Sequence, residues 1–320
     1  MSLSISVNLG KVKRMLSIIV PAYNEEEVLY EFYRRITGVL EGLGLPYELV
    51  FVNDGSRDDT LALLESLSRQ DDRVVVIDLS RNFGKEIAVS AGIDFARGEA
   101  IVIIDADLQD PPELIPALVE QWRNGYDNIY ARRISRDGES IIKKTTSFLF
   151  YRFIRGMTQI DIPADTGDFR LLSRRAVDAL KQLPERNRFM KGLYAWIGYP
   201  AIAVDYKRDP RYAGETKWNY WKLWNFALEG ITSFTEIPLK LASYIGGFVA
   251  FMAFCYGAYI IVDTIVFGND VAGYPSLIVT ILFLGGIQLI FIGILGEYLG
   301  RAFSETKRRP LYFVNKIIKK

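Results

Sequence analysis

Two segments near the C-terminus of this 320-residue chain contain no charged residue: residues 241–262 and residues 271–296. An apolar helix of about 20 residues is long enough to cross the hydrocarbon core of a bilayer, which is about 30 Å thick. The segments therefore predict two transmembrane helices, at about 241–262 and 273–297, within a membrane region of 238–300. The alternative is a pair of buried helices in a soluble domain.

The basic residues around these segments predict their orientation. The connection at 263–270 contains two acidic residues and no lysine or arginine, whereas basic residues recur after the second segment. By the positive-inside rule, both chain ends and the preceding domain are expected in the cytoplasm, with 301–320 as a basic cytoplasmic tail. The apolar run at 16–21 is too short for the core of a secretory signal, which agrees with a cytoplasmic N-terminal domain.

Composition excludes several kinds of chemistry. Histidine is absent, and cysteine occurs once, as Cys255 within an apolar segment. Ser-His-Asp and Cys-His catalysis, histidine-based zinc sites and disulfide scaffolds are thereby excluded. Any bound metal must be held by carboxylates and phosphates, which favours Mg²⁺ or Mn²⁺. The formal net charge of +1 gives no electrostatic support for a nucleic-acid partner.

Strand-like and helix-like patterns alternate over the first hundred residues. Continuous apolar runs predict buried strands, and helical spacing of apolar residues predicts the helices between them. The strands are expected at 16–20, 47–52, 74–79 and 100–104, and the helices at 24–42, 60–69 and 85–96. This alternation predicts an α/β domain over 1–217, with a Rossmann-like, mostly parallel sheet and helices on both faces. Ligands of such sheets bind beyond the carboxyl ends of the strands.

Two further segments combine apolar and polar residues in a way that fits a membrane surface. Residues 140–156 mix large apolar residues with four lysines and arginines. This segment fits a basic amphipathic helix at the membrane interface, or equally an ordinary helix with one side in the core. Residues 218–237 are rich in tryptophan, tyrosine and phenylalanine just before the first apolar segment, as in an interfacial aromatic belt.

The polar residues after the fourth expected strand carry the most specific chemical signal. Asp105 and Asp107 flank Ala106, and Gln109 and a Pro-Pro pair follow closely. Two carboxylates at this spacing can converge on one divalent ion, which bridges two phosphates and offsets the charge of a departing nucleoside diphosphate. Alone, such a pair is common as a solvated strand end.

Two other polar clusters follow the first and second expected strands, at 21–26 and 52–60. Their carboxylates can accept hydrogen bonds from a nucleoside, and Gly55 lets the backbone turn and approach a ligand closely. The alternative is that both clusters are helix-capping loops, with Asn24 and Asp58 or Asp59 as caps.

These three clusters, together with the motifs at 79–85, 165–170 and 211–217, resemble family 2 glycosyltransferases of the GT-A fold. With two C-terminal spans, the whole chain looks like the polyprenyl-phosphate subgroup. That subgroup comprises the dolichyl-phosphate mannosyltransferases and the bacterial bactoprenol glucosyltransferases of the GtrB type. The two-span ending is typical of the bactoprenol branch. The resemblance implies an integral, multi-pass protein of the bacterial inner membrane.

The resemblance also assigns residues to the donor. It implies that Asp107, with Asp105, ligates Mg²⁺ or Mn²⁺. It places the nucleotide sugar against Pro21, Ala22, Tyr23, Glu25, Asp54, Lys85, Asp105, Ala106 and Gln109. Asp168 matches the aspartate that such enzymes use near the acceptor, as a base or to orient the nucleophile.

For the acceptor, the resemblance implies a phosphate site made of Arg133, Lys143 and Ser147, for which Arg132 and Lys144 are possible substitutes. Further phosphate contacts are expected from Arg170, Arg211 and Lys217. A phosphate monoester has a second pKa of about 6, so it needs nearby cations and positioning more than a strong base. Asp168 is therefore expected to orient the nucleophile or to hold Arg170. The alternative is a purely structural ion pair between these two residues.

The implied reaction is inverting transfer of glucose from UDP-glucose to undecaprenyl phosphate at the cytoplasmic face, for cell-surface glycan modification. A GDP-mannose donor, or UDP carrying another sugar such as an aminoarabinose, is the nearest alternative. A processive polysaccharide synthase would carry a Gln-x-x-Arg-Trp motif, which this sequence lacks. A non-catalytic scaffold or transporter subunit is a further alternative, although Gln288 is the only strongly polar residue in the spans. Glycines in the spans also fit a homo-oligomer.

Overall fold

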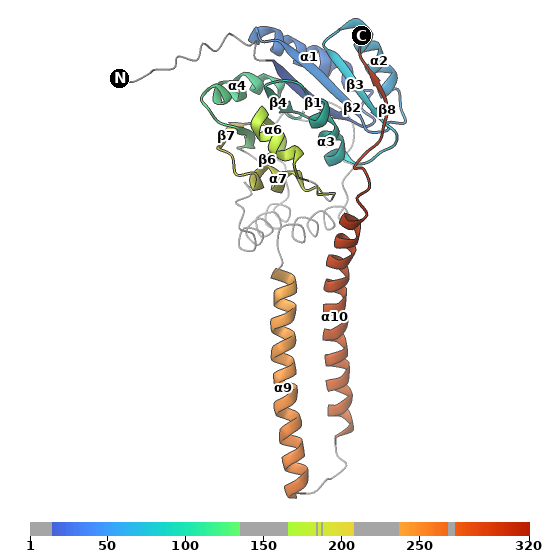
Figure 1. Cartoon of the computed structure of the whole chain (residues 1–320), viewed down its shortest axis with the longest axis vertical. Helices are drawn as coiled ribbons and strands as arrows, with labels where there is room; N and C mark the ends of the chain where they lie inside the picture. The colour runs from blue at the N-terminus through green and yellow to red at the C-terminus, as the bar shows by residue number, and fades with distance from the viewer. Residues whose placement is uncertain (1–14, 135–165, 184, 187, 208–236, 268–272) are drawn as a thin grey trace, which may run out of the picture.

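The computed structural model describes residues 15–134, 166–183, 185, 186, 188–207, 237–267 and 273–320. These residues form a head, built on one sheet with helices around it, and two long helices that project from it (Figure 1). The expected interfacial segments at 140–156 and 218–236 lie outside the described residues.

One eight-stranded sheet organises the head, in the order β7-β5-β6-β4-β1-β2-β3-β8. The strands are β1 (Leu16–Ala22), β2 (Tyr47–Asn53), β3 (Val74–Leu79), β4 (Ala100–Ile103), β5 (Asn128–Arg133), β6 (Thr166–Ser173), β7 (Ala201–Tyr206) and β8 (Val314–Ile318). The pairs β4–β1, β1–β2 and β2–β3 are parallel, and so is the pair β5–β7. By contrast, β6 is antiparallel to β4 and β5, and β8 is antiparallel to β3. The expected α/β sheet is therefore confirmed as a mixed sheet whose parallel part is β1 to β4.

Helices cover both faces of the sheet. They are α1 (Leu29–Leu43), α2 (Thr60–Gln70), α3 (Lys85–Phe95), the 3₁₀ turn η1 (Pro112–Leu114), α4 (Ile115–Arg123), α6 (Arg174–Lys181) and α7 (Met190–Trp196). On one face, α1, α2 and α4 pack through Phe32, Leu64 and Leu118 onto strand residues that include Ile18. On the other face, α3, α6 and α7 pack onto Ile19 and its neighbours. Adjacent strand residues point to opposite faces, so the continuous apolar run of β1 contributes to both cores.

Two segments differ from the sequence-based expectation. The first helix begins at Leu29 rather than at residue 24, because Asn24 has a φ of 53° and the chain turns there before the helix. The region 301–320 was expected as a tail, yet α10 continues to Thr306 and residues 314–318 form β8 on the edge of the sheet. A strand next to β3 satisfies backbone groups that an open edge would leave unpaired.

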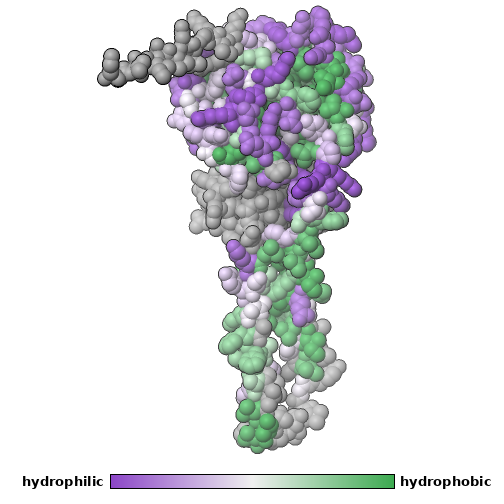
Figure 2. All heavy atoms as spheres, viewed as in Figure 1, coloured by the Kyte–Doolittle hydropathy of each residue, from purple (hydrophilic) through white to green (hydrophobic). Residues whose placement is uncertain are grey.

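The two projecting helices are α9 (Ile237–Phe267) and α10 (Tyr274–Thr306). The stretches Leu239–Tyr256 of α9 and Phe283–Thr306 of α10 are, by length and composition, apolar enough to cross a membrane. Large apolar side chains such as Phe248, Phe254 and Leu289 are exposed, and Figure 2 shows the apolar hairpin below a largely polar head. The helices approach each other at Gly246, where an added Cβ would lie 3.3 Å from the ring of Phe291.

Candidate active site

The polar clusters after β1 and β2 meet at the carboxyl edge of the sheet, as expected. The backbone N–H of Asn24 donates to Ser56 Oγ at 3.1 Å, and the N–H of Arg57 donates to Asn24 Oδ1 at 2.9 Å. The N–H of Glu25 donates to Thr60 Oγ1 at 2.9 Å. The two loops are therefore bonded to each other, which explains why Asn24 adopts its unusual backbone conformation.

Asp54 joins the second cluster to the segment before α3. Its buried carboxylate accepts hydrogen bonds from the backbone N–H groups of Phe83 at 2.7 Å and Gly84 at 3.0 Å. Burial raises the pKa of Asp54, and these two hydrogen bonds only partly oppose the rise. Gly55 beside it has a φ of 66°, and a Cβ there would lie 2.5 Å from backbone atoms of Arg81 and Asn82. Only glycine fits this close approach of the two loops.

Lys85, the first residue of α3, connects the cluster after β4 to β6. Its Nζ lies 2.7 Å from Asp105 Oδ2 and 2.6 Å from Asp168 Oδ2. The Lys85 side chain remains 40% exposed, so this triad faces solvent at the edge of the sheet. An ammonium group thus lies between the first aspartate of the presumed metal motif and the aspartate expected near the acceptor.

The charges of this triad shift each other's pKa values. Burial would lower the pKa of Lys85, but Asp105 and Asp168 outweigh it and raise that pKa well above its usual value. Burial would likewise raise the pKa of Asp168, but Lys85, with help from Lys191, holds it far below its usual value. Asp168 is therefore a carboxylate at neutral pH. Its Oδ1 is buried and has no hydrogen-bond partner among the described residues.

Asp105 differs from Asp168 although both contact Lys85. Burial raises the pKa of Asp105. Lys85 opposes this rise and Asp168 adds to it, so that the pKa of Asp105 stays raised. The neighbouring Asp107 accepts a hydrogen bond at Oδ1 from the N–H of Gln109 at 3.1 Å. Among the described residues, no group of three or more acidic, cysteine or histidine side chains could hold a metal by itself.

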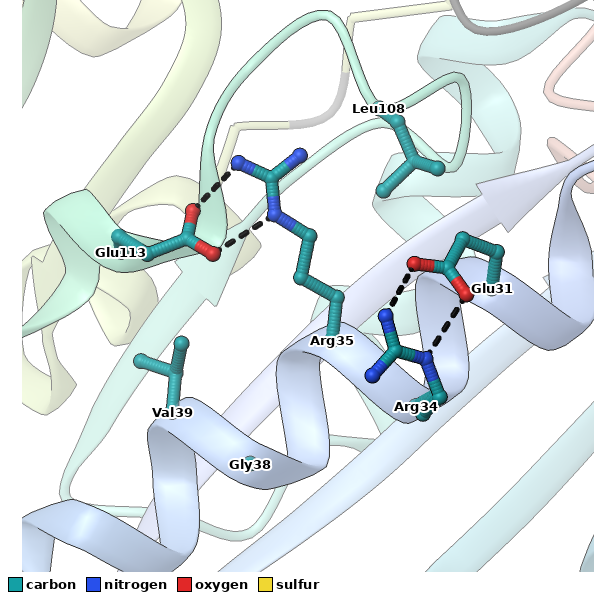
Figure 3. Close-up of a pocket in the computed structure, with 7 residues that line it drawn as sticks. All are labelled: Glu31, Arg34, Arg35, Gly38, Val39, Leu108 and Glu113. Atoms are coloured by element: carbon teal, nitrogen blue, oxygen red, sulfur yellow. Dashed lines mark hydrogen bonds and ion pairs between the residues drawn. The ribbon is translucent and has the colours of Figure 1, made fainter.

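A pocket of about 590 Å³ lies on the other side of this loop, where Leu108 meets α1. Its charged residues pair with one another, as Figure 3 shows. Arg34 bonds Glu31, and Arg35 bonds Glu113 through two contacts of 2.7 Å. The pair from Arg35 to Glu113 ties α1 to the turn η1 that follows the aspartate motif. This ion pair therefore connects the loop to α1.

The structure separates the two arginines that the sequence left as alternatives. Arg133 Nε donates to the Tyr206 hydroxyl at 3.3 Å, and that hydroxyl donates to the buried Asp110. A Cβ on Gly167 would lie 3.4 Å from Arg133 Nη2, so Arg133 points toward the start of β6 beside Asp168. Arg132 instead forms an exposed ion pair with Asp205 on β7, at 2.6 Å.

Arg170 lies beneath the site rather than in it. It is 4% exposed, and its guanidinium stacks 3.8 Å from the ring centre of Tyr194. It donates to Gly167 O at 3.1 Å and to Asn128 Oδ1 at 3.4 Å. The expectation that Asp168 holds Arg170 is therefore corrected, because the ion pair of Asp168 is with Lys85. Arg170 helps to lower the pKa of Asp168 only through a longer-range electrostatic effect.

Several expected residues lie outside the described residues: Lys143, Lys144, Ser147, Arg211 and Lys217. Sequence reasoning missed Asp110, Tyr206 and Lys191. Asp110 closes the motif that begins at Asp105, and its place there was a usable signal. Tyr206 and Lys191 gave no local signal, because both reach the site only through tertiary packing.

Comparisons with known proteins identify the family of this chain. The model of glycosyl transferase family 2 matches residues 17–181, and the model of the GtrB C-terminal hairpin matches residues 237–302. A prophage bactoprenol glucosyl transferase homolog of Escherichia coli K12 is 50% identical over 95% of this chain and 99% of its own length. The bactoprenol glucosyl transferase of Shigella phage SfII is 50% identical, covering 94% and 97%.

An uncharacterized glycosyltransferase of Synechocystis is 55% identical over 94% of both chains. Each of these relatives therefore matches both the head and the hairpin. Together with the two exposed apolar helices, the hairpin match makes this a membrane-associated protein. The chain belongs to glycosyltransferase family 2 and carries the C-terminal hairpin of the GtrB type.

Proposed function

We propose that this protein transfers glucose from UDP-glucose to a polyprenyl phosphate such as undecaprenyl phosphate, with inversion at the anomeric carbon. The observation that carries the proposal is the ammonium of Lys85 between Asp105 and Asp168, at the edge where the donor motif and β6 meet. In this proposal the anionic donor binds on the Asp105 side of this ammonium and the anionic acceptor on its Asp168 side. The identity to bactoprenol glucosyl transferases over nearly the whole chain supports glucose and a polyprenyl carrier.

On the donor side, residues 21–25 and the turn at Asp54 are proposed to line the nucleoside. Asp107 and Asp105 fit a hard divalent ion, because they offer carboxylate oxygens, and the donor diphosphate is proposed to supply further oxygen ligands. Such an ion, when bound, would offset the negative charge on the departing UDP. An ion pair from Arg35 to Glu113 ties the turn η1, which follows these aspartates, to α1.

On the acceptor side, a phosphate oxygen attacks the anomeric carbon as the bond from that carbon to UDP breaks. The attacking oxygen is already ionised, so the protein must attract and aim it. Arg133, held by Tyr206 and Asp110, is proposed to supply charge, and the Asp168 carboxylate to orient the acceptor. Lys143, Ser147, Arg211 and Lys217 are proposed to complete the phosphate site.

The hairpin has a defined role in this proposal. A lipid acceptor keeps its chain in the bilayer and presents only its phosphate at the surface. We propose that α9 and α10 cross the bacterial inner membrane with both chain ends in the cytoplasm, which fits the acidic connection and the basic tail. The head, attached to both helices, is then held close to the headgroups.

The test is transfer of radiolabelled sugar to undecaprenyl phosphate by the purified full chain in detergent. UDP-glucose, UDP-galactose and GDP-mannose are supplied in turn, with Mg²⁺, Mn²⁺ or EDTA, and Asp107→Ala is the control. Lipid labelling from UDP-glucose that needs metal and is lost in the control is the expected result. Labelling from GDP-mannose alone would contradict UDP-glucose as the donor. If the chain binds UDP but labels no lipid, the assignment of undecaprenyl phosphate as the acceptor is wrong. If it binds no nucleotide, a non-catalytic scaffold is favoured.

A further inference from the structure

The end of the chain returns from the hairpin to the sheet and lies beside the donor loops. In Figure 1 the segment after α10 runs up to the head and along β3. Glu305, at the end of α10, accepts a hydrogen bond from the N–H of Arg186 at 2.9 Å, and Tyr312 donates to Asp94 at 2.8 Å. The strand β8 then pairs antiparallel with β3. This pairing joins residues more than 230 positions apart in the chain, next to the site.

A buried carboxylate links β8 to the turn that carries Asp54. Asn315 Nδ2 on β8 donates to Asp78 Oδ2 at 2.7 Å, and Asn53 Nδ2 on β2 donates to Asp78 Oδ1 at 2.7 Å. Asp78 is 3% exposed and Asn53 is 1% exposed. The other end of the Asn53 amide, Oδ1, accepts from the N–H of Ser56 at 3.3 Å. Asp78 therefore fixes which way the Asn53 amide points, and this direction closes the turn at 53–56.

A second contact reaches the other donor loop. The carbonyl of Phe313, just before β8, accepts a hydrogen bond from the N–H of Ser80 at 2.9 Å. Ser80 begins the segment 80–84, whose far end is bonded to Asp54 and whose middle packs on Gly55. The C-terminal segment is therefore linked to both loops that Asp54 joins. It reaches the turn at 53–56 through Asp78 and Asn53, and it bonds the segment 80–84 directly through the backbone.

We propose that Asn315 is a positioning residue for nucleotide binding, so that the C-terminal strand is part of the donor site's support. The inference rests on the proposed function, because it assumes that the loops around Asp54 hold the donor. Without the Asn315 amide, one oxygen of the buried Asp78 carboxylate loses its partner, and an unsatisfied buried acceptor is costly. The Asn53 amide can then turn toward that oxygen, which releases Ser56 and loosens the turn.

The experiment compares Asn315→Leu with Lys316→Ala in the full chain in detergent. Lys316 is the next residue on the same strand and forms an ion pair with Glu65, so its loss weakens the strand's attachment without removing a bond to Asp78. UDP affinity is measured by calorimetry, and the KM values for UDP-glucose and for undecaprenyl phosphate are measured separately. Thermal melting reports whether the two variants lose similar stability.

The expected result is a rise of about tenfold in the UDP Kd and donor KM for Asn315→Leu, the scale of one lost hydrogen bond to a charged group. Its acceptor KM should stay unchanged, and Lys316→Ala should bind UDP like the wild type. Equal UDP affinity in both variants would overturn the inference, whatever their stability. If Asn315→Leu does not fold, Asn315→Ser is read by the same criteria. A wild-type chain that binds no UDP would instead contradict the proposed function.

Discussion

The two sides of the site are held by different kinds of interaction. Around Asp54, the donor loops are joined by backbone N–H groups that donate to side-chain oxygens. On the other side, arginines of β5 and β6 are braced by aromatic side chains: Arg133 bonds the Tyr206 hydroxyl at the site, and beneath it Arg170 stacks on Tyr194. Lys85 is the contact between the two sides.

This difference suggests how the two substrates are handled. Loops fixed by many directional hydrogen bonds suit recognition of a rigid nucleotide by shape and polarity. Partly buried cations such as Arg133 and Lys85 suit an anion that has to be drawn next to another anion. The chain without histidine thus achieves its proposed chemistry by arranging fixed charges, and the following predictions test each side separately.

The largest effect is expected at the contact between the two sides. Lys85→Met leaves Asp105 and Asp168 facing each other without a cation, and repulsion between the two carboxylates then disfavours having both ionised. The pKa of Asp168, now held low by Lys85, should rise, so the acidic limb of the pH profile of kcat/KM should move to higher pH. At neutral pH we expect a loss of about 100-fold or more in kcat/KM.

Lys85→Arg is the matched control, because it keeps the positive charge. Its acidic limb should stay close to that of the wild type even if its rate falls. A Lys85→Met enzyme with an unshifted pH profile would show that Lys85 does not set the ionisation of Asp168.

The next effect tests the assignment of the acceptor side to one arginine. Arg133→Ala should raise the KM for undecaprenyl phosphate about 10- to 100-fold, the range expected for one or two charge-assisted hydrogen bonds. Arg132→Ala removes only an exposed pair with Asp205 and should change this KM by no more than about twofold. Steady-state kinetics with varied lipid at saturating donor gives both values.

Tyr206→Phe sharpens this comparison. It keeps the charge of Arg133 but removes the hydroxyl between that arginine and Asp110. An intermediate rise in the acceptor KM is expected. Equal effects at Arg132 and Arg133 would mean that neither arginine is specifically aimed at the phosphate.

The donor side was largely predictable from sequence, for a physical reason. Parallel strands buried on both faces are continuous apolar runs, so β1 to β4 were expected within three residues of their observed bounds. The carboxyl ends of such strands meet at one edge, so the clusters after β1, β2 and β4 were expected together there. The loops between them then bond locally, as Asn24 and Ser56 do.

The acceptor side was not predictable in the same way. The strands β5 and β6 mix arginines and other polar residues with apolar ones, and β7 is only partly buried, so no clean pattern marks them. Arg133 meets Tyr206 across 73 residues of chain because β5 and β7 pair in parallel, a register that no local signal specifies. The strand β8 was missed because a short edge strand next to basic residues looks like a tail.

The smallest predicted effect is on stability, and it tests whether a charged contact helps to join β5 to β6. Asp127, just before β5, accepts from Ser173 Oγ at 2.6 Å and from Arg175 Nε at 2.5 Å. Burial raises the pKa of Asp127, but these partners outweigh it and leave that pKa lowered. A lowered folded-state pKa adds stability above the unfolded value of about 3.9, and this stability is lost as the pH falls through the folded value.

Asp127→Asn should therefore lower the free energy of unfolding by about 1 kcal/mol at pH 7, a modest value because Arg175 is largely exposed. The difference from the wild type should start to shrink below about pH 4, where the carboxylate of the unfolded chain becomes protonated, and it should vanish only below the lowered folded-state pKa. Melting of the purified chain in detergent between pH 3 and pH 7 measures both. A difference that stays constant over this range would mean that the side chain's shape, rather than its charge, joins β5 to β6.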